Sequence, residues 1–471
     1  MKAEEIELIQ SKKNAAIVAP AGHGKTEMIT ELVEKLPGKK LVLTHTNAGV
    51  SVLKQRINKK RISQDRYCLL TISSFCMKWC GSYPVTARID PRVRISDKPF
   101  FNAQYCGTEQ IFTHSWARSV LAKTYSCVIV DEYQDCMVEQ HRIFVEINRT
   151  VPVYVLGDPL QSIFGWAGKP VSWNNLPFER VFVETMPHRW EKTNADLGAY
   201  LTAVRETLMP ALEGKKVRLS TVPNGSFIKR IPPSATLGIE LIREMNQYES
   251  ALYLTKWPRA QCAFSKQTGG IFQNDEPQNM AELYDYAQRL DTEDGSIKAK
   301  AVFSFIEECA TRINAELGSY KKHINNGDHN FTQIKKHPEF GERMLRLYEN
   351  NCYDDILSVL NWIKFHSLFK VCRKELFNEL IRSVRHARDK GITIYEAAQQ
   401  IRTVSIYHSQ YAGFKKLSSR VVLSKGLEFE CVVIDLKERY TVTEMYVAMT
   451  RAMRTIYFIT DKDSILLDTP Q

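Results

Sequence analysis

Residues 19–26 read Ala-Pro-Ala-Gly-His-Gly-Lys-Thr, an arrangement suited to holding phosphate groups. Glycines let backbone N–H groups turn toward phosphate oxygens, and the start of a following helix favours an anion. Lys25 would reach the β- and γ-phosphates, and Thr26 would bind Mg²⁺. The loop follows an apolar run and precedes a helical segment, as a phosphate-binding loop requires. The residues expected to hold a nucleoside triphosphate are Ala21, Gly22, His23, Gly24, Lys25 and Thr26.

Two adjacent carboxylates, Asp131 and Glu132, end a second apolar run that begins at Cys127. A carboxylate is poorly placed there unless a cation pairs with it. Asp131 is expected to hold Mg²⁺, directly or through water, and Glu132 to orient and deprotonate an attacking water. The alternative is an exposed acidic strand end, which the neighbouring phosphate loop disfavours. The two motifs predict hydrolysis of a nucleoside triphosphate, but not what the hydrolysis drives.

Short apolar runs in the first 195 residues indicate the elements that position these groups. The runs are continuous rather than alternating, which is typical of strands buried on both faces of a parallel sheet. They cover residues 15–19, 40–44, 68–72, 127–131, 153–157 and 180–184. Polar residues follow the runs, and the carboxyl ends of parallel strands meet at one edge of the sheet. We therefore expect one site rather than several.

The chain of 471 residues is too long for one ordinary domain. We expect an α/β fold with two RecA-like parallel-sheet domains, the nucleotide cleft between them, and an inserted, mainly helical subdomain in each. The first domain is predicted to comprise residues 1–80 and 119–195, with a small insertion at 81–118. The second is predicted to comprise residues 196–265 and 401–471, with a helical insertion at 266–400.

The net charge of +11 favours a polyanionic partner, although solubility alone is the alternative explanation. The 11 cysteines include no CxxC pair, which fits reduced thiols in the cytoplasm. No segment has the apolar length of a membrane span, and the N-terminus has no apolar signal core. The histidines are scattered along the sequence, so we assign none of them to a metal site. We expect a cytoplasmic protein without a membrane partner.

Seven ordered motifs resemble those of superfamily 1 DNA helicases of the UvrD/Rep type. After the phosphate loop they include Thr-His-Thr-Asn-Ala at 44–48, Thr-Ile-Ser-Ser-Phe at 71–75 and Asp-Glu-Tyr-Gln-Asp at 131–135. The long Leu-Gly-Asp-Pro-Leu-Gln-Ser-Ile-Phe-Gly-Trp stretch at 156–166 is the most specific. His-Arg at 188–189, Lys-Gly-Leu-Glu-Phe at 425–429 and Tyr-Val-Ala-Met-Thr-Arg-Ala at 446–452 follow.

The resemblance implies roles for several residues in a site that binds ATP and Mg²⁺. Gln161 would sense the γ-phosphate and the attacking water. Arg189 and Arg451 would stabilise charge on the transferred phosphoryl group. Glu428 would contact the ribose, and Gly426 would permit close backbone approach. Arg451 comes from the second α/β domain, so ATP would lie in the cleft between domains.

The same resemblance implies a path for single-stranded DNA along Thr46, Asn47, Phe75 and Trp166. Trp166 would stack on a base, which contributes about 1–3 kcal/mol without sequence preference. The alternative for Trp166 is a core tryptophan, which the glycines around it disfavour.

Some positions depart from the family pattern. Glu7 aligns best with the family's adenine-reading glutamine, with Gln10 nearby, and a carboxylate cannot donate to an adenine ring nitrogen. Val422 and Ser73 each stand where a histidine is usual, which predicts altered coupling between DNA contact and the ATP site. His23 occupies a position that is commonly small and polar, and we expect its ring to point outward.

Together these features favour an ATP-dependent single-stranded DNA translocase or helicase, with 3′-to-5′ polarity implied by the resemblance. A second hypothesis is a DNA-stimulated ATPase sensor that binds DNA ends or gaps and regulates a partner nuclease or ATPase in phage defence. In size and layout the chain is similar to the helicase-like subunit of Gabija antiphage defence. A third hypothesis, an ATP-binding scaffold without turnover, is disfavoured because Glu132 and Arg451 are both present.

Overall fold

The computed structural model describes residues 2–90, 99–163, 165, 168–183, 185–234, 237–276, 280–350, 352–408 and 414–470. The chain divides into two compact units. The first comprises Met1–Pro233, Ser409–Gly413 and Ser424–Gln471, and the second comprises Ser234–His408 and Phe414–Leu423. Each unit has its own hydrophobic core. The predicted division into RecA-like domains and insertions follows different boundaries and stays a prediction.

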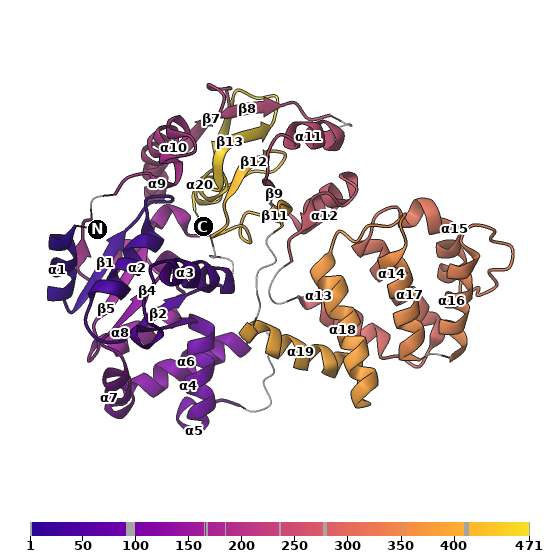
Figure 1. Ribbon diagram of the computed structural model, residues 1–471, viewed down its shortest axis with the longest axis horizontal. Coiled ribbons are helices and arrows are strands. Elements are labelled where there is room, and N and C mark those ends of the chain that lie inside the picture. The colour runs from indigo at the N-terminus through magenta and orange to yellow at the C-terminus, as the bar shows by residue number, and fades with distance from the viewer. Residues whose placement is uncertain are drawn as a thin grey trace. The chain divides into compact units, whose positions relative to one another are not determined.

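The first unit contains a six-stranded parallel sheet with strand order β3-β2-β4-β5-β1-β6 (Figure 1). Its strands are β1 (Asn14–Val18), β2 (Lys40–Thr44), β3 (Tyr67–Thr71), β4 (Cys127–Val130), β5 (Val153–Gly157) and β6 (Arg180–Val181). β2, β4 and β5 are buried throughout, as their continuous apolar sequences predicted. Each of the six predicted runs contains a strand that starts within one residue of the expected position, but β6 covers only the first two residues of the predicted run 180–184.

Helices cover both faces of this sheet. Successive strand residues point to opposite faces, and the strands contribute to a separate core cluster on each face. Ile17, Ile129 and Leu156 pack in one core cluster with residues of α1 (Ala3–Ser11), α2 (Lys25–Lys35) and α3 (Asn47–Lys59). Val130 and Val155 belong to the opposite cluster. That cluster includes residues of α4 (Ile72–Ser82), α5 (Pro84–Ala87), α6 (Phe100–Thr113), α7 (Ser115–Thr124) and α8 (Val138–Asn148).

The remaining elements of the first unit include the C-terminal segment of the chain. They are α9 (His188–Glu191), α10 (Ala195–Leu208), β7 (Val217–Ser220), β8 (Ile228–Ile231), β12 (Phe429–Asp435), α20 (Val442–Met449), β13 (Ala452–Ile459) and β14 (Ser464–Leu467). β12, β13 and β8 pair in parallel, whereas β14 and β7 form an antiparallel pair. Trp190 ties α9 to β13, because its indole N–H donates to the Ala452 carbonyl at 2.7 Å.

The second unit begins with α11 (Leu237–Met245), β9 (Ala251–Thr255), α12 (Pro258–Gln267) and β10 (Gln273–Asn274), and ends with β11 (Lys416–Arg420). β11 pairs in parallel with both β9 and β10. β11 ends at Arg420, because residues 421–423 form a turn instead of extended backbone.

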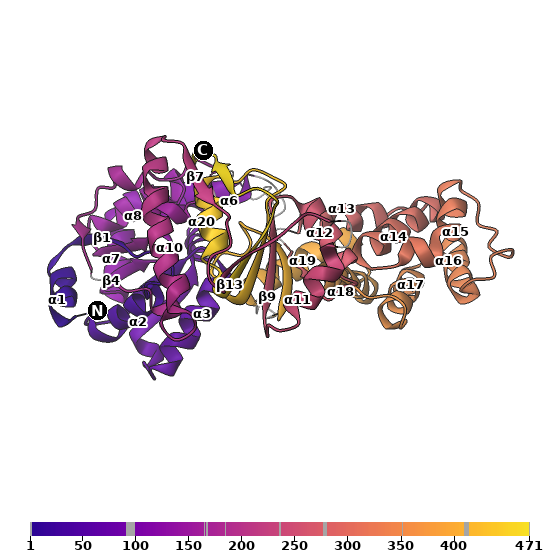
Figure 2. The same ribbon diagram turned by 90° about the horizontal axis from the view of Figure 1, so that it is seen from above.

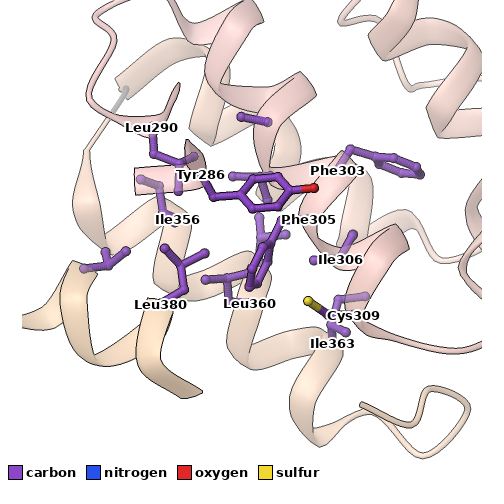
Figure 3. Packing of buried hydrophobic residues seen from close by; sticks show 14 of the residues in the cluster. Tyr286, Leu290, Phe303, Phe305, Ile306, Cys309, Ile356, Leu360, Ile363 and Leu380 are labelled. Carbon is purple, nitrogen blue, oxygen red and sulfur yellow. The ribbon is translucent and has the colours of Figure 1, made fainter. Parts of the chain in front are cut away.

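The helices that follow β10 in the described part of the second unit lie together (Figure 2). They are α13 (Ala281–Leu290), α14 (Gly295–Cys309), α15 (Ile313–Asn325), α16 (Pro338–Asn350), α17 (Tyr353–Phe365), α18 (Lys374–Lys390) and α19 (Ile394–His408). Figure 3 shows side chains from several of these helices converging, among them Tyr286, Phe305, Ile306, Leu360 and Leu380. α14 supplies buried residues around most of its circumference, so it is the central helix of this core.

The predicted α/β class with two parallel sheets is confirmed. The second six-stranded sheet has the strand order β10-β11-β9-β12-β13-β8. None of the described helices combines the length and the apolar character that crossing a bilayer requires.

Candidate nucleotide-hydrolysis site

The loop between β1 and α2 has the backbone of a phosphate cradle. Gly22 and Gly24 both adopt positive φ, at +72° and +84°. A Cβ added at Gly22 would lie 2.5 Å from Cζ3 of Trp190, so no side chain fits there without displacing that ring. Gly24 is the N-cap of α2, whose first residues are Lys25 and Thr26. The sequence therefore needs glycine at both positions, and the free N–H groups at the start of α2 favour an anion.

Lys25 emerges from this helix start toward the two carboxylates that follow β4. Its Nζ forms an ion pair with Glu132 and lies 3.3 Å from Oδ1 of Asp131. Burial acts to lower the pKa of Lys25, but Asp131 and Glu132 outweigh it and raise that pKa above its ordinary value. Burial raises the pKa of Asp131. Lys25 is therefore a fixed cation facing an acidic pair.

Glu132 is held in an unusual backbone conformation at the edge of the sheet. Its φ is +54°, a region that non-glycine residues seldom adopt. Nε2 of the buried Gln134 donates to Oε2 of Glu132 at 2.5 Å, while Oε1 of Gln134 accepts from the Asp158 N–H at 3.0 Å. Although burial opposes it, the positive charges of Lys25 and Lys425 hold the pKa of Glu132 well below its usual range. The carboxylate is thus ionised and oriented, as a proton acceptor must be.

Gln161 and Arg451 meet in the same place, although 290 residues separate them in the sequence. Oε1 of Gln161 accepts from Nη2 of Arg451 at 3.4 Å. Arg451 also donates to the carbonyls of Val447 (3.0 Å) and Leu427 (3.3 Å), which fix its guanidinium. Burial and the neighbouring Arg189 lower the pKa of Arg451 to about 10, so it remains charged at neutral pH. A buried, fixed cation beside Gln161 is suited to stabilising developing negative charge.

A second lysine, Lys425, approaches Glu132 from the C-terminal segment. Its Nζ forms an ion pair with Asp135, donates to the Gln161 carbonyl at 2.8 Å and lies 3.3 Å from Oε2 of Glu132. Burial raises the pKa of Asp135 to about 6, against the effect of Lys425. Lys425 belongs to a recognised motif, but nothing in the local pattern predicted a role for it. Its partners Asp135 and Gln161 lie more than 260 residues away.

Arg189 on α9 pairs with Glu428, the residue predicted to contact the ribose. Its Nη2 lies 2.7 Å from Oε1 of Glu428, and its Nη1 donates to the Thr450 carbonyl. Gly426, with φ of +85°, lines the same cavity. A Cβ added there would meet no described atom within 4 Å, so the left-handed conformation alone favours glycine. The ion pair therefore joins Arg189, predicted to stabilise the phosphoryl group, to Glu428, predicted to contact the ribose.

One cavity of about 720 Å³ contains most of the predicted nucleotide-site residues. Its lining includes Ala21, Gly22, Gly24, Lys25, Thr26, Asp131, Glu132, Gln161, Arg189, Gly426, Glu428 and Arg451. The volume is in the range of small-molecule sites. Thr26 and Asp131 contribute a hydroxyl and a carboxylate, the oxygen ligands that Mg²⁺ prefers, so the donor set fits the ion.

Three predicted nucleotide contacts do not line this cavity. Glu7 and Gln10 lie on exposed positions of α1. His23 was expected to point outward, but it is 7% exposed and its Nδ1 lies 3.1 Å from the hydroxyl of Thr185. Burial lowers the pKa of His23 to about 4, so the ring is neutral at pH 7. His23 is therefore buried and is not directed outward into solvent.

Of the predicted DNA contacts, the structure describes Thr46, Asn47 and Phe75. Thr46 lines the cavity and caps α3, because its hydroxyl accepts from the Gly49 N–H at 3.0 Å, and Asn47 is the first residue of that helix. Phe75 was expected on the strand path, but it is 2% exposed and stacks on Phe112 with ring centroids 5.9 Å apart. In this structure Phe75 is a core residue. Trp166 lies outside the described residues.

The sequence analysis assigned no role to Asp158 and Gln134, whose hydrogen bonds hold the residues of the site in position. Asp158 is fully buried and accepts from Nη2 of Arg205 at 2.9 Å and from Nε2 of Gln161 at 3.4 Å. Gln134 connects Glu132 to the end of β5. Both Gln134 and Asp158 belong to recognised motifs, and their polar side chains next to apolar strands were the available signal.

Comparison with known proteins gives two sequence matches, one of which covers the N-terminal segment of the chain. Residues 2–167 match the family model described as AAA domain. This segment contains Lys25, Glu132 and Gln161, but not Arg189 or Arg451. A stretch of 56 residues is 32% identical to the RecBCD enzyme subunit RecB of Buchnera aphidicola subsp. Schizaphis graminum, covering 12% of this chain and 5% of RecB.

Two solved structures are similar at low levels. One is described as the complex structure of Arterivirus nonstructural protein 10 (helicase) with DNA, at 9% identity and a TM-score of 0.36, covering 98% of this chain and 63% of that chain. The other is the crystal structure of the same Arterivirus protein, at 8% identity and a TM-score of 0.34, covering 98% and 62%. The chain thus spans less than two thirds of the length of these relatives. The AAA domain match and the RecB segment agree with the motif resemblance to superfamily 1 helicases.

Proposed function

We propose that this protein is an ATP-dependent single-stranded DNA translocase or helicase of the UvrD/Rep type. The observation that carries the proposal is the contact between Gln161 and Arg451 in the cavity that also contains Lys25 and Glu132. A phosphate loop and an acidic pair serve many NTPases. An arginine supplied in cis from a distant segment, next to a γ-phosphate sensor, is the arrangement that lets bound ATP hold two parts of a chain together.

The residues of the cavity divide the work of hydrolysis in this proposal. Lys25 binds the β- and γ-phosphates. Its ion pair with Glu132 is then replaced by an ion pair with the phosphates. Glu132 then takes a proton from the attacking water, which Gln161 orients. Arg451 and Arg189 stabilise negative charge on the transferred group. Mg²⁺, held by Thr26 and Asp131, would neutralise phosphate charge when bound.

In this proposal, movement along DNA follows when ATP is hydrolysed and its products leave the cavity. ATP bridges Lys25 and Arg451 and favours the closed arrangement, and hydrolysis with product release removes the bridge. DNA as the partner is supported by the net charge of +11 and by the motif resemblance, which implies contacts from Thr46, Asn47 and Trp166. The 3′-to-5′ polarity rests on the resemblance alone. Trp166→Ala should weaken binding of single-stranded DNA while leaving ATP binding unchanged.

ATPase rates without nucleic acid and with single-stranded DNA, blunt duplex or RNA test the proposal. We expect single-stranded DNA to give the largest stimulation, and 3′-tailed duplexes to be displaced in preference to 5′-tailed ones. Absence of ATP-dependent displacement on both duplexes would remove the unwinding activity. Absence of stimulation by any nucleic acid would overturn the motor assignment as a whole.

The assignment of the base has its own test in Glu132→Gln. The amide keeps the size of the side chain but cannot accept a proton, so turnover should fall by about 10²–10⁴-fold while ATP still binds. Turnover at the parent rate would show that another group activates the water.

A DNA-stimulated sensor that regulates a partner nuclease is the second candidate, and one contact favours it. Ser73 replaces a histidine of the family pattern, and its hydroxyl lies 2.9 Å from the Tyr105 hydroxyl, within the N-terminal part of the chain. This contact is consistent with altered coupling between DNA and ATP. DNA-stimulated ATPase activity without movement, together with recovery of a nuclease in a pull-down, would favour this function over the motor.

A further inference from the structure

Two histidines that are far apart in the sequence meet in the second unit. His337 precedes α16, Glu339 lies in the first turn of α16, and His366 caps the C-terminal end of α17. One potential ligand atom from each of the three side chains lies within 4.8 Å of the other two. No local pattern pairs these residues, because 29 positions separate the histidines.

Two carboxylates flank the imidazole ring of His337. Nε2 faces Oε2 of Glu316 at 3.4 Å, and Nδ1 faces Oε1 of Glu339 at 3.7 Å. A neutral imidazole can donate to only one of these carboxylates. If Nε2–H points to Glu316, the lone pair of Nδ1 faces the oxygen of Glu339. Two facing acceptors are repulsive unless a proton or a metal ion lies between them.

Glu316 is arranged as the outer partner of a metal-bound histidine. It is already paired with Lys336 at 2.6 Å and Arg312 at 3.1 Å, so it does not need a charged His337 to balance it. A carboxylate that accepts from the distal nitrogen of a histidine fixes the tautomer and the ring orientation that metal binding needs. The Tyr320 hydroxyl, 2.8 Å from the His337 carbonyl, further fixes this segment.

Aromatic side chains hold the two imidazoles in place. The rings of His337 and His366 lie with centroids 5.4 Å apart and nearly perpendicular, at 87°. Trp362 and Phe369 contact both rings, at centroid distances between 4.7 and 6.1 Å. An apolar surround limits access of water and fixes the ligands, both of which favour a defined metal site.

We propose that His337, His366 and Glu339 bind a divalent transition-metal ion, for which Zn²⁺ is the best match. Two imidazoles and one carboxylate suit Zn²⁺ and not Mg²⁺ or Ca²⁺, which prefer oxygen ligands alone. The fourth position would be filled by water, since Glu339 is partly exposed (42%). The ion would join the start of α16 to the end of α17.

The required adjustment is small. Tetrahedral bonds of about 2.1 Å put ligand atoms about 3.4 Å apart, so the side chains must close by up to about 1.4 Å. Glu339, which is partly exposed, has the freedom to do so. Nδ1 of His366 accepts a long hydrogen bond from the Leu368 N–H at 3.3 Å, and metal binding requires the ring to give up this weak contact.

Zinc binding to the full chain tests the proposal, with the protein stripped of metal and without nucleotide or Mg²⁺. Calorimetric titration should show one equivalent of Zn²⁺ bound by the parent protein and lost in His366→Ala and in Glu339→Gln. His323→Ala is the matched control. That residue is another histidine of the same unit beside a carboxylate, with Nδ1 2.6 Å from Asp328, but it lies outside the cluster.

Two further measurements exclude other zinc ligands. Co²⁺ bound at this site should give visible absorption without the thiolate-to-metal band that the cysteines would produce. Zn²⁺ at about 100 times its Kd should raise the Tm of the parent by about 5–10 °C and leave that of His366→Ala unchanged. Equal Zn²⁺ affinity in the parent and His366→Ala, or no binding by either, would overturn the proposal.

Discussion

Nζ of Lys425 lies 3.3 Å from Oε2 of Glu132, so the carboxylate that faces Lys25 on one side faces a second lysine on the other. Lys425 also forms the ion pair of Asp135, whose side chain is fully buried. This lysine therefore joins the C-terminal segment to the acidic motif of the first sheet. Its two contacts have separable consequences for stability and for turnover.

Lys425→Met should destabilise the protein by about 3–5 kcal/mol, because it leaves the buried carboxylate of Asp135 without its cation. The double variant Lys425→Met with Asp135→Asn should recover a large part of this loss, since no uncompensated charge remains. Urea unfolding of the two single variants and the double variant measures the coupling. Additive losses in the double variant would show that the ion pair does not contribute to stability.

The turnover of the double variant gives the second readout. Because Lys425 donates to the Gln161 carbonyl and lies beside Glu132, its loss removes a contact that positions both side chains and should reduce ATP hydrolysis even where folding is restored. A double variant that is both stable and fully active would assign Lys425 a purely structural role.

Arg451→Lys should lower kcat by about 10³–10⁵-fold with a small change in KM for ATP, the range lost when an arginine finger is removed. A lysine keeps the charge but cannot maintain the directed hydrogen bonds that fix the guanidinium. Arg454→Ala is the control, because that arginine also lies on the C-terminal segment but is 54% exposed and pairs with the surface carboxylate of Glu430. Equal effects of the two substitutions would contradict the assignment.

Those parts of the site that depend on local pattern could be predicted from the sequence. The strands β4 and β5 and the glycine-containing phosphate loop could be predicted, because each is encoded by residues that are adjacent in the chain. Phe75 shows the limit of this reasoning, because the sequence of a motif does not distinguish a side chain that packs in the core from one that contacts a ligand. The partners of Lys425 and the meeting of His337 with His366 depend on tertiary packing, which no local periodicity reports.

Gly22→Ala should impair nucleotide binding and reduce stability through two separable causes. The positive φ of +72° strains any side chain, and a Cβ would lie 2.5 Å from Trp190. Gly214→Ala isolates the first cause, because Gly214 has φ of +85° and its added Cβ would meet no described atom within 4 Å. Strain alone should cost about 1–2 kcal/mol. Gly22→Ala should cost more and weaken ATP binding, whereas identical losses in both variants would exclude the contact with Trp190.

His23 should make the stability of the protein depend on pH in a predictable direction. Burial lowers its pKa to about 4 in the folded state, against an unfolded value near 6.5. Between these values the unfolded chain binds more protons at this position, so the free energy of unfolding contributed by His23 rises as pH increases from about 4 to 6.5 and is constant above. The contribution reaches its lowest, constant value below about pH 4, where both states are protonated.

His23→Gln removes this titration while keeping a polar group near Thr185. Burial also lowers the pKa of His45, to about 3, and raises the pKa of Asp135 to about 6. Both groups remain in the variant, so the difference between parent and variant isolates His23. Urea unfolding at pH 5 and pH 7.5 should show a smaller pH dependence in His23→Gln than in the parent. An equal dependence in both proteins would mean that the imidazole of His23 is accessible and protonated in the folded state.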